Sequence, residues 1–181
     1  PRLRSPLKIL IFGGGSGKIL IDILTHTAPD KIYYVYISRQ MILRAERRLA
    51  SHRTVHKTSP SVSFICGSWN DIPSVEFDLI VTPFVLDCFQ PAALREVMQC
   101  LSARLAMPGQ WLFADFHLPE GAMRPFASAV TRMLYVAFNL LCGLGVKKLP
   151  DFAADFATLG LHKTAEKYSL KGMLVSRVYE R

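Results

Sequence analysis

The chain has 181 residues, of which 50% are hydrophobic, 20% are charged and 10% are aromatic. This composition excludes a disordered or fibrous protein, and we expect residues 1–181 to form a single packed domain. The formal net charge is +8, from 22 Lys and Arg against 14 Asp and Glu, which favours acidic partners without identifying one.

No stretch of the sequence resembles a membrane span or a signal peptide. The longest nearly unbroken apolar run, residues 133–141, is far shorter than the roughly 20 residues needed to cross a bilayer. The cysteines are scattered without a CxxC pair, which favours buried, reduced thiols over zinc ligands: Cys66, Cys88, Cys100 and Cys142. We therefore expect a cytoplasmic protein with no membrane segment and no metal.

The first segments alternate between strand and helix patterns. Residues 7–12 form a short apolar run that ends at a cluster of glycines, and apolar residues then recur at helical spacing from Ile19 to Leu24. Residues 32–37 are β-branched and aromatic, and Ser38 then caps a second helix. The apolar face of this helix is predicted to be Met41, Ile42, Ala45 and Leu49.

Three more strands and a third helix are expected before residue 117. The strands are residues 62–66, 77–81 and 111–116, and Pro91 begins the helix. Its apolar stripe is predicted to contain Leu94, Val97, Met98, Leu101 and Leu105. Because the apolar runs are continuous and alternate with helices, they indicate a parallel, doubly wound α/β sheet covered on both faces.

The pattern changes in the C-terminal third. Residues 126–142 have the pattern of a long apolar helix, and residues 151–159 that of a short helix ended by Gly160. Two strand-like runs within residues 161–180 are joined at Lys171-Gly172. A direct hairpin at this position predicts an antiparallel strand at the edge of the sheet.

The glycine turn after the first strand is the clearest functional signal. Its four glycines place bare backbone amides at a helix N-terminus, so a carboxylate, ribose or phosphate can approach without meeting a Cβ. The pattern fits GxGxG but neither a phosphate-binding loop nor GxGxxG, whose last position holds Lys18. The turn predicts a nucleotide-like ligand, with a purely structural turn as the alternative; its glycines are Gly13, Gly14, Gly15 and Gly17.

Several segments together resemble class I S-adenosylmethionine-dependent methyltransferases. ILIFGGGSGKIL looks like their first motif, YVYISRQMILRAERRL like their second strand and helix, and FDLIVTPFVLDCF with LAMPGQWLFADF like their fourth and fifth strands. The C-terminal part resembles a little-characterised bacterial branch of that superfamily. The resemblance implies a Rossmann-like, doubly wound sheet of seven strands, mostly parallel with an antiparallel last strand, and S-adenosylmethionine as the cofactor.

The resemblance also implies which residues surround the cofactor. They are the four glycines together with Tyr36, Ile37, Ser68, Trp69, Asp71, Thr82 and Pro83. Family members often carry N-terminal helices over the site, so here either the acceptor site is open to solvent or such a segment is missing from the sequence.

The sequence departs from the family at three positions that are commonly acidic. They hold Ile11, Tyr36 and Ser68, and a phenol cannot accept two hydrogen bonds from a ribose diol as a carboxylate does. Trp69 offers an aromatic face to adenine, and Asp71 is a substitute carboxylate that fits a cap before a proline equally well.

The chemistry expected of such an enzyme requires few catalytic residues. Methyl transfer from a sulfonium has an excellent leaving group, so positioning and exclusion of water supply much of the catalysis. If a base is used, weak candidates follow the fourth and fifth strands: Asp87, Asp115 and His117. Asp115 and His117 occupy alternate positions that can share one face. A solvated loop is the alternative for Asp87 and His117.

Two further features bear on partners. Basic residues concentrate on and after the second helix, which suits phosphate binding or a solvated face: Arg39, Arg44, Arg47, Arg48, Arg53 and Lys57. No aromatic residue is interleaved there, which weakens the case for nucleic acid. Tyr135, Phe138, Leu141 and Leu144 fit an acceptor pocket, a self-association face or core packing.

The most economical hypothesis is therefore methyl transfer to a small or medium organic acceptor. The alternative is a catalytically silent methyltransferase-like module that binds a protein or RNA through its basic face.

Overall fold

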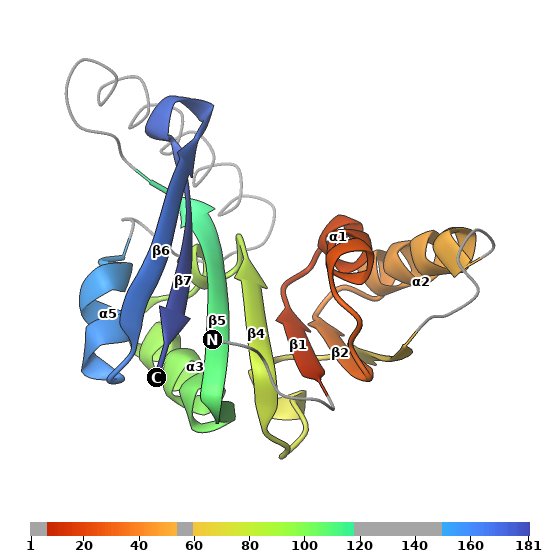
Figure 1. Ribbon diagram of the computed structural model, residues 1–181, viewed down its shortest axis with the longest axis horizontal. Helices are drawn as coiled ribbons and strands as arrows, with labels where there is room; N and C mark the ends of the chain where they lie inside the picture. Colours follow the sequence, from red (N-terminus) through yellow and green to blue (C-terminus); the bar gives the residue numbers. More distant parts are fainter. Residues whose placement is uncertain (1–6, 54–59, 118–149) are drawn as a thin grey trace.

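The computed structural model describes residues 7–53, 60–117 and 150–181. These residues form a seven-stranded sheet in the order β3-β2-β1-β4-β5-β7-β6 (Figure 1). The parallel strands on the N-terminal side are β1 (Lys8–Phe12), β2 (Lys31–Tyr36), β3 (Ser61–Cys66), β4 (Phe77–Pro83) and β5 (Leu105–Phe116). The last strand in sequence, β7 (Leu174–Glu180), runs antiparallel between β5 and β6 (His162–Ser169). The predicted α/β sheet with an antiparallel last strand is confirmed.

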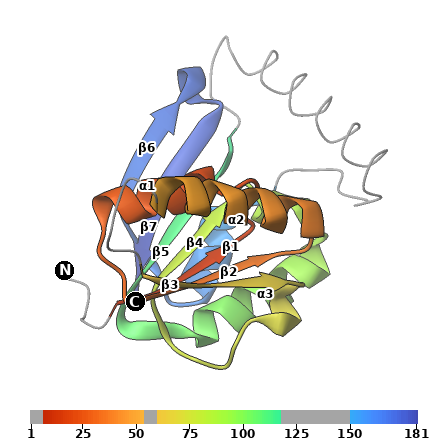
Figure 2. The same cartoon turned by 90° about the vertical axis from the view of Figure 1, so that its right-hand side faces the viewer.

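Helices cover both faces of this sheet, because alternate residues of its strands are apolar on either side. On one face, α1 (Lys18–His26) and α2 (Arg39–Arg53) pack on Ile9 and Ile11 of β1. On the other, α3 (Pro91–Ala103) and α5 (Phe152–Thr158) pack on Leu10 of β1 and on Trp111 and Phe113 of β5. Figure 2 shows α1 and α2 in front of the strands.

The second helix forms as the sequence predicts. Three of the four predicted apolar residues, Ile42, Ala45 and Leu49, are buried, and Met41 is half-buried. The helix begins directly after Ser38, whose carbonyl accepts a hydrogen bond from the amide of Ile42 at 3.1 Å.

One predicted boundary is wrong. The third helix ends at Ala103, so Leu105 does not extend its apolar stripe but begins β5, where it pairs with Phe77 of β4. The register shifts between Phe77 and Leu79, and residues 106–109 are accommodated there as a bulge. Pro108 and Gly109, residue types that weaken strand pairing, lie inside this strand, which begins earlier than the predicted residue 111.

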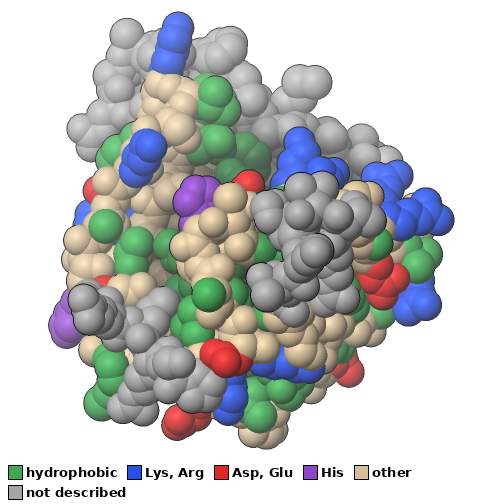
Figure 3. All heavy atoms as spheres, turned by 45° about the vertical axis from the view of Figure 1, so that its right-hand side comes forward, with side chains coloured by type: hydrophobic (Ala, Val, Ile, Leu, Met, Phe, Trp, Pro, Cys, Tyr) green, Lys and Arg blue, Asp and Glu red, His purple; other side chains and the backbone are tan. Residues whose placement is uncertain are grey.

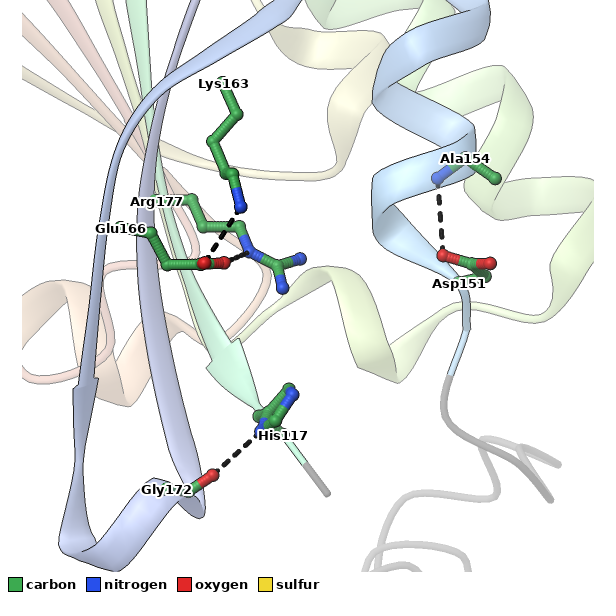
Figure 4. A network of polar contacts seen from close by, with 7 residues as sticks. All are labelled: His117, Asp151, Ala154, Lys163, Glu166, Gly172 and Arg177. Carbon is green, nitrogen blue, oxygen red and sulfur yellow. Dashed lines mark hydrogen bonds and ion pairs between the residues drawn. The ribbon is translucent and has the colours of Figure 1, made fainter. Parts of the chain in front are cut away.

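The C-terminal hairpin carries the polar contacts drawn in Figure 4. Glu166 of β6 forms ion pairs with Lys163 at 2.8 Å and with Arg177 of β7 at 2.6 Å. At the start of α5, the Asp151 carboxylate accepts a hydrogen bond from the amide of Ala154 at 3.3 Å, as expected of an N-cap. The 3₁₀ turn η4 (Leu170–Gly172) joins the two strands where the sequence predicts the hairpin.

The predicted helix over residues 126–142 lies outside the described residues, as do Tyr135, Phe138, Leu141 and Leu144. Within the described ranges, no helix has the length and apolar character of a membrane span.

Candidate functional site

Four glycines make the turn after β1, and neighbouring side chains explain three of them. A Cβ at Gly13 would overlap Val85, one at Gly14 would lie 2.6 Å from the Tyr34 ring, and one at Gly17 would lie 2.8 Å from Ala45 of α2. At Gly15, where φ is +61°, no described atom lies within 4 Å of such a Cβ. Gly15 is therefore the position at which the turn meets open space.

The carbonyl groups of this turn are held from the side of β2 and α2. The Tyr34 hydroxyl donates a hydrogen bond to the Gly15 carbonyl at 2.9 Å, and Arg48 Nε donates one to the Ser16 carbonyl at 3.1 Å. Burial raises the pKa of Tyr34 well above its ordinary value, so the hydroxyl keeps its proton. These two bonds fix the conformation of the turn without using its open side.

A pocket of about 360 Å³ adjoins the turn at the carboxyl ends of the strands. This volume lies within the range of small-molecule sites. Among the described residues its lining contains no Asp, Glu, Lys, Arg or His, and it comprises Phe12, Gly13, Tyr36, Ile37, Gly67, Ser68, Trp69, Phe84, Val85, Cys88 and Phe89. Ligand recognition at this surface therefore relies on aromatic faces and uncharged hydrogen-bonding groups.

The aromatic residues of one wall pack against one another. The rings of Phe12 and Phe89 are stacked with centroids 6.2 Å apart, and Trp69 meets the edge of Phe89 at 5.4 Å. Ile37, which also lines the pocket, is 77% exposed.

The structure brings five of the predicted cofactor residues to this pocket, leaves Gly14, Gly15 and Gly17 in the adjoining turn, and gives the remaining residues other roles. Gly13, Tyr36, Ile37, Ser68 and Trp69 line it. Thr82 is fully buried, and its hydroxyl accepts a hydrogen bond from Trp111 Nε1 at 2.9 Å, so its side chain belongs to the core. Pro83 pairs with Ala114 in the sheet.

Asp71 acts as a cap, which is one of its two expected roles. Its carboxylate accepts hydrogen bonds from the Ser68 amide at 2.8 Å and the Ser68 hydroxyl at 3.2 Å. The Ser68 hydroxyl in turn accepts one from the amide of Asn70 at 3.3 Å. This capping box begins the 3₁₀ turn η1 (Trp69–Asp71) and engages the Ser68 hydroxyl and Asp71 Oδ2. The third unusual position, Ile11, is fully buried in the core.

The sequence interpretation did not single out Val85, Cys88 and Phe89, which line the pocket after β4 together with Phe84. Phe84 has a left-handed φ of +52°, donates its amide to the Ala114 carbonyl at 2.7 Å and leaves its ring 44% exposed. Such a conformation in a bulky residue is uncommon and is found at ligand sites more often than elsewhere. The segment FVLDCF directly follows an apolar strand. This position in the sequence indicates a place beside the ligand crevice, because the carboxyl ends of parallel strands face that crevice.

Two of the catalytic candidates form a buried carboxyl pair. Asp87, in the 3₁₀ turn η2 (Leu86–Cys88), is 2% exposed and Asp115, near the end of β5, is fully buried. Asp115 accepts hydrogen bonds from the amides of Asp87 at 3.2 Å and Phe116 at 2.9 Å. Burial, and next the charge of Asp87, raise the pKa of Asp115 well above its ordinary value. The solvated-loop interpretation of Asp87 is therefore wrong.

The third candidate, His117, is turned toward the hairpin. Its Nδ1 lies 2.9 Å from the Gly172 carbonyl (Figure 4), and its ring packs on Tyr168 at 4.9 Å. Because a carbonyl only accepts hydrogen bonds, Nδ1 carries the proton, and Nε2 has the free lone pair when the ring is neutral. Asp115 and His117 thus have different partners and do not form the acid–base pair that their spacing suggested.

Basic side chains gather on the side of the molecule that carries α2 (Figure 3). Arg39, Arg44, Arg47 and Arg48 are exposed, and Arg48 also reaches the glycine turn. The side chain of Arg53 and the whole of Lys57 lie outside the described part of the chain. In that described part, no three His, Cys, Asp or Glu residues form a group able to hold a metal ion.

Comparison with protein families matches residues 10–110, more than half of the chain, to the methyltransferase domain. The matched segment runs from β1 to the middle of β5 and includes the glycine turn and most of the pocket. A comparison with curated protein sequences found no match.

Solved structures with the same fold include TnmH and two whose titles name a methyltransferase. TnmH is 19% identical, with a TM-score of 0.73, and the match covers 99% of this chain and 51% of that one. The mitomycin 7-O-methyltransferase MmcR is 16% identical, with a TM-score of 0.72, over 100% of this chain and 50% of that one. The magnesium protoporphyrin IX methyltransferase of Synechocystis PCC 6803, solved with bound SAH, is 14% identical, with a TM-score of 0.69, over 99% and 76%. The chain thus spans about half the length of the first two.

Proposed function

The chain belongs to the methyltransferase domain family, and from this premise we propose that it binds S-adenosylmethionine in the pocket beside the glycine turn and transfers the methyl group to a small or medium organic acceptor. The observation that carries the proposal is the coincidence of an open Gly15 with an aromatic pocket of about 360 Å³ at the same edge of the sheet.

The residues present fit such a ligand in two respects. Above Gly15, a ligand can approach the backbone without meeting a side chain among the described residues. Trp69 and Phe89 supply aromatic surface of the kind on which a base stacks. In a site that holds a ribose diol through a carboxylate, the lining carries a negative charge, whereas the described lining of this pocket is neutral.

The sulfonium supplies an already activated methyl group, so the protein's contribution is to position the acceptor and exclude water. The loop after β4 is suited to this task because Phe84 presents an exposed ring that packs on Phe116 at 5.6 Å. His117, with its lone pair on Nε2, is the candidate to accept a proton from an acceptor hydroxyl or amine. Asp115 is fully buried, so we give it a structural role in holding η2.

Calorimetric titration with S-adenosylhomocysteine, S-adenosylmethionine and NAD tests the proposal directly. We expect binding of the two adenosyl ligands, no binding of NAD, and a rise in melting temperature, because a ligand that binds only the folded chain stabilises it. Absence of binding at millimolar ligand would favour the silent module that binds a protein or RNA partner.

The location of the ligand is tested with the substitution Gly15→Leu. Its side chain would occupy the open space above the turn, so the melting shift should disappear. Gly160→Leu is the matched control, because Gly160 also has a left-handed φ, +69°, and no described atom within 4 Å of its Cβ position. It should carry the same backbone strain and keep the shift; a shift that survives in Gly15→Leu places the ligand elsewhere.

A further inference from the structure

The polar side chains of the pocket can offer little to a ribose. Its lining, in the part of the chain that the structure describes, has no charged side chain. Hydrogen bonds to a carboxylate are roughly twice as strong as those between neutral groups. A ligand held here therefore gains no charge-assisted hydrogen bond from the described lining.

The carboxylate beside this wall is already engaged. Asp71 Oδ2 accepts hydrogen bonds from both the amide and the hydroxyl of Ser68, and Asp71, an exposed residue, is not among the described residues that line the pocket. The Ser68 hydroxyl both donates to Asp71 and accepts from Asn70.

The pocket does offer aromatic surface from both layers of the fold. Phe12, Trp69 and Phe89 pack on the core that contains α3 and α5. Tyr36, at the end of β2, packs on the core that contains α1 and α2. A planar base entering the pocket therefore meets the wall that contains Phe12, Trp69 and Phe89, and stacking of this kind does not depend on the sugar.

We infer that this pocket recognises its adenosyl ligand through the base and does not read the ribose hydroxyls, and that Tyr36 is the residue that sets this specificity. The inference rests on the proposed function. Such a pocket tolerates sugar-modified ligands, because Tyr36 lies in its lining at the end of β2 and brings no negative charge.

The test compares S-adenosylhomocysteine with its 2′-deoxy and 3′-deoxy analogues by calorimetry on the full chain. We expect the dissociation constants of the three ligands to agree within about threefold, because only neutral hydrogen bonds are at stake. A loss of more than about threefold for either analogue would show that the pocket reads the diol, and would overturn the inference. If S-adenosylhomocysteine itself does not bind, the proposed function fails and this inference fails with it; discrimination among ligands that do bind overturns the inference alone.

The role of Tyr36 is tested by Tyr36→Asp, with Tyr36→Asn as its uncharged control of similar size. The carboxylate variant should bind the parent ligand about tenfold or more tightly than the deoxy analogues, whereas the amide variant should not distinguish them. Equal binding of all three ligands by Tyr36→Asp would show that this position does not face the ribose.

Tyr36→Phe keeps the ring and provides a test that survives if the smaller residues fail to fold, as judged by thermal melting. Its affinity for all three ligands should remain within about threefold of the parent chain. A larger loss that is specific to the hydroxylated ligand would show that the phenol reads the sugar, and would overturn the inference.

Discussion

The two sides of the pocket are held in place by different physical means. The glycine turn is fixed by close packing and neutral hydrogen bonds, through Tyr34 and Ala45. The loop after β4 is tied to β5 by the hydrogen bond that the amide of Asp87 donates to the buried carboxyl group of Asp115. A larger side chain in the glycine turn should therefore lower stability at any pH. The stability of the loop after β4 should instead depend on the protonation of its buried carboxyl groups.

The largest effect should come from Gly17→Ala. The new Cβ would lie 2.8 Å from the Cα and Cβ of Ala45, inside α2, and the φ of +84° disfavours any side chain. We expect the free energy of unfolding, measured by urea denaturation, to fall by about 2–4 kcal/mol.

Gly15→Ala is the comparison for this substitution. This substitution causes the same left-handed backbone strain, but no described atom lies within 4 Å of the new Cβ. The free energy of unfolding should therefore fall by only about 1–2 kcal/mol. Equal losses for the two variants would contradict the distinction between packed and open glycines.

Asp115→Asn should change how stability depends on pH. Because the folded-state pKa of Asp115 is raised by burial, its contribution to stability is complete below the unfolded pKa near about 3.9 and is lost as pH rises through the folded value. The variant has no charge to bury, so its free energy of unfolding should lack this decline.

Urea denaturation between about pH 4 and pH 8 measures the difference, since this range begins at the unfolded pKa. Near the acid end, the variant should be about 1 kcal/mol less stable, because one amide oxygen replaces two oxygens that accept from Asp87 and Phe116. The deficit should shrink with increasing pH. Parallel curves for the two proteins would show that Asp115 does not titrate in this way.

The smallest effect should come from Tyr34→Phe, which removes the hydrogen bond to the Gly15 carbonyl and leaves the ring in place. We expect a loss of about 1 kcal/mol in the free energy of unfolding, with no change between pH 5 and pH 8. Tyr33→Phe is the control, because the Tyr33 ring packs edge-on against Phe77 at 5.6 Å on the other face. A similar loss in both variants would mean that the bond does not hold the turn.

The fold was largely predictable because its elements are local patterns. Apolar runs, a Ser before α2 and a glycine after α5 mark boundaries that neighbouring residues determine. The start of β5 was not predictable in this way. It depends on the pairing of Leu105 with Phe77, 28 residues earlier, and on a bulge that tolerates Pro108 and Gly109.

The site was predictable only in outline. The glycine turn located it, but the pattern could not show that Gly14 and Gly17 make room for Tyr34 and Ala45 while Gly15 faces open space. Phe84 and Phe89 reach the pocket because of the course of the loop after β4, and the hydrophobic periodicity of the sequence does not indicate the course of a loop. Likewise, spacing along β5 suggested that Asp115 works with His117. Its hydrogen-bonding partner is instead Asp87, in the connection that follows β4.

The outermost strand has a consequence for the behaviour of the protein in acid. All eight residues of β6 are exposed, and its outer edge is of the kind on which another chain can add a strand and start aggregation. The hydrogen bond from Lys163, with that from Arg177, lowers the pKa of Glu166 to about 2. An incoming strand would therefore have to cover ionised Lys163 and Glu166 even where most carboxylates are protonated, so this edge should stay protected against aggregation in moderately acidic solution.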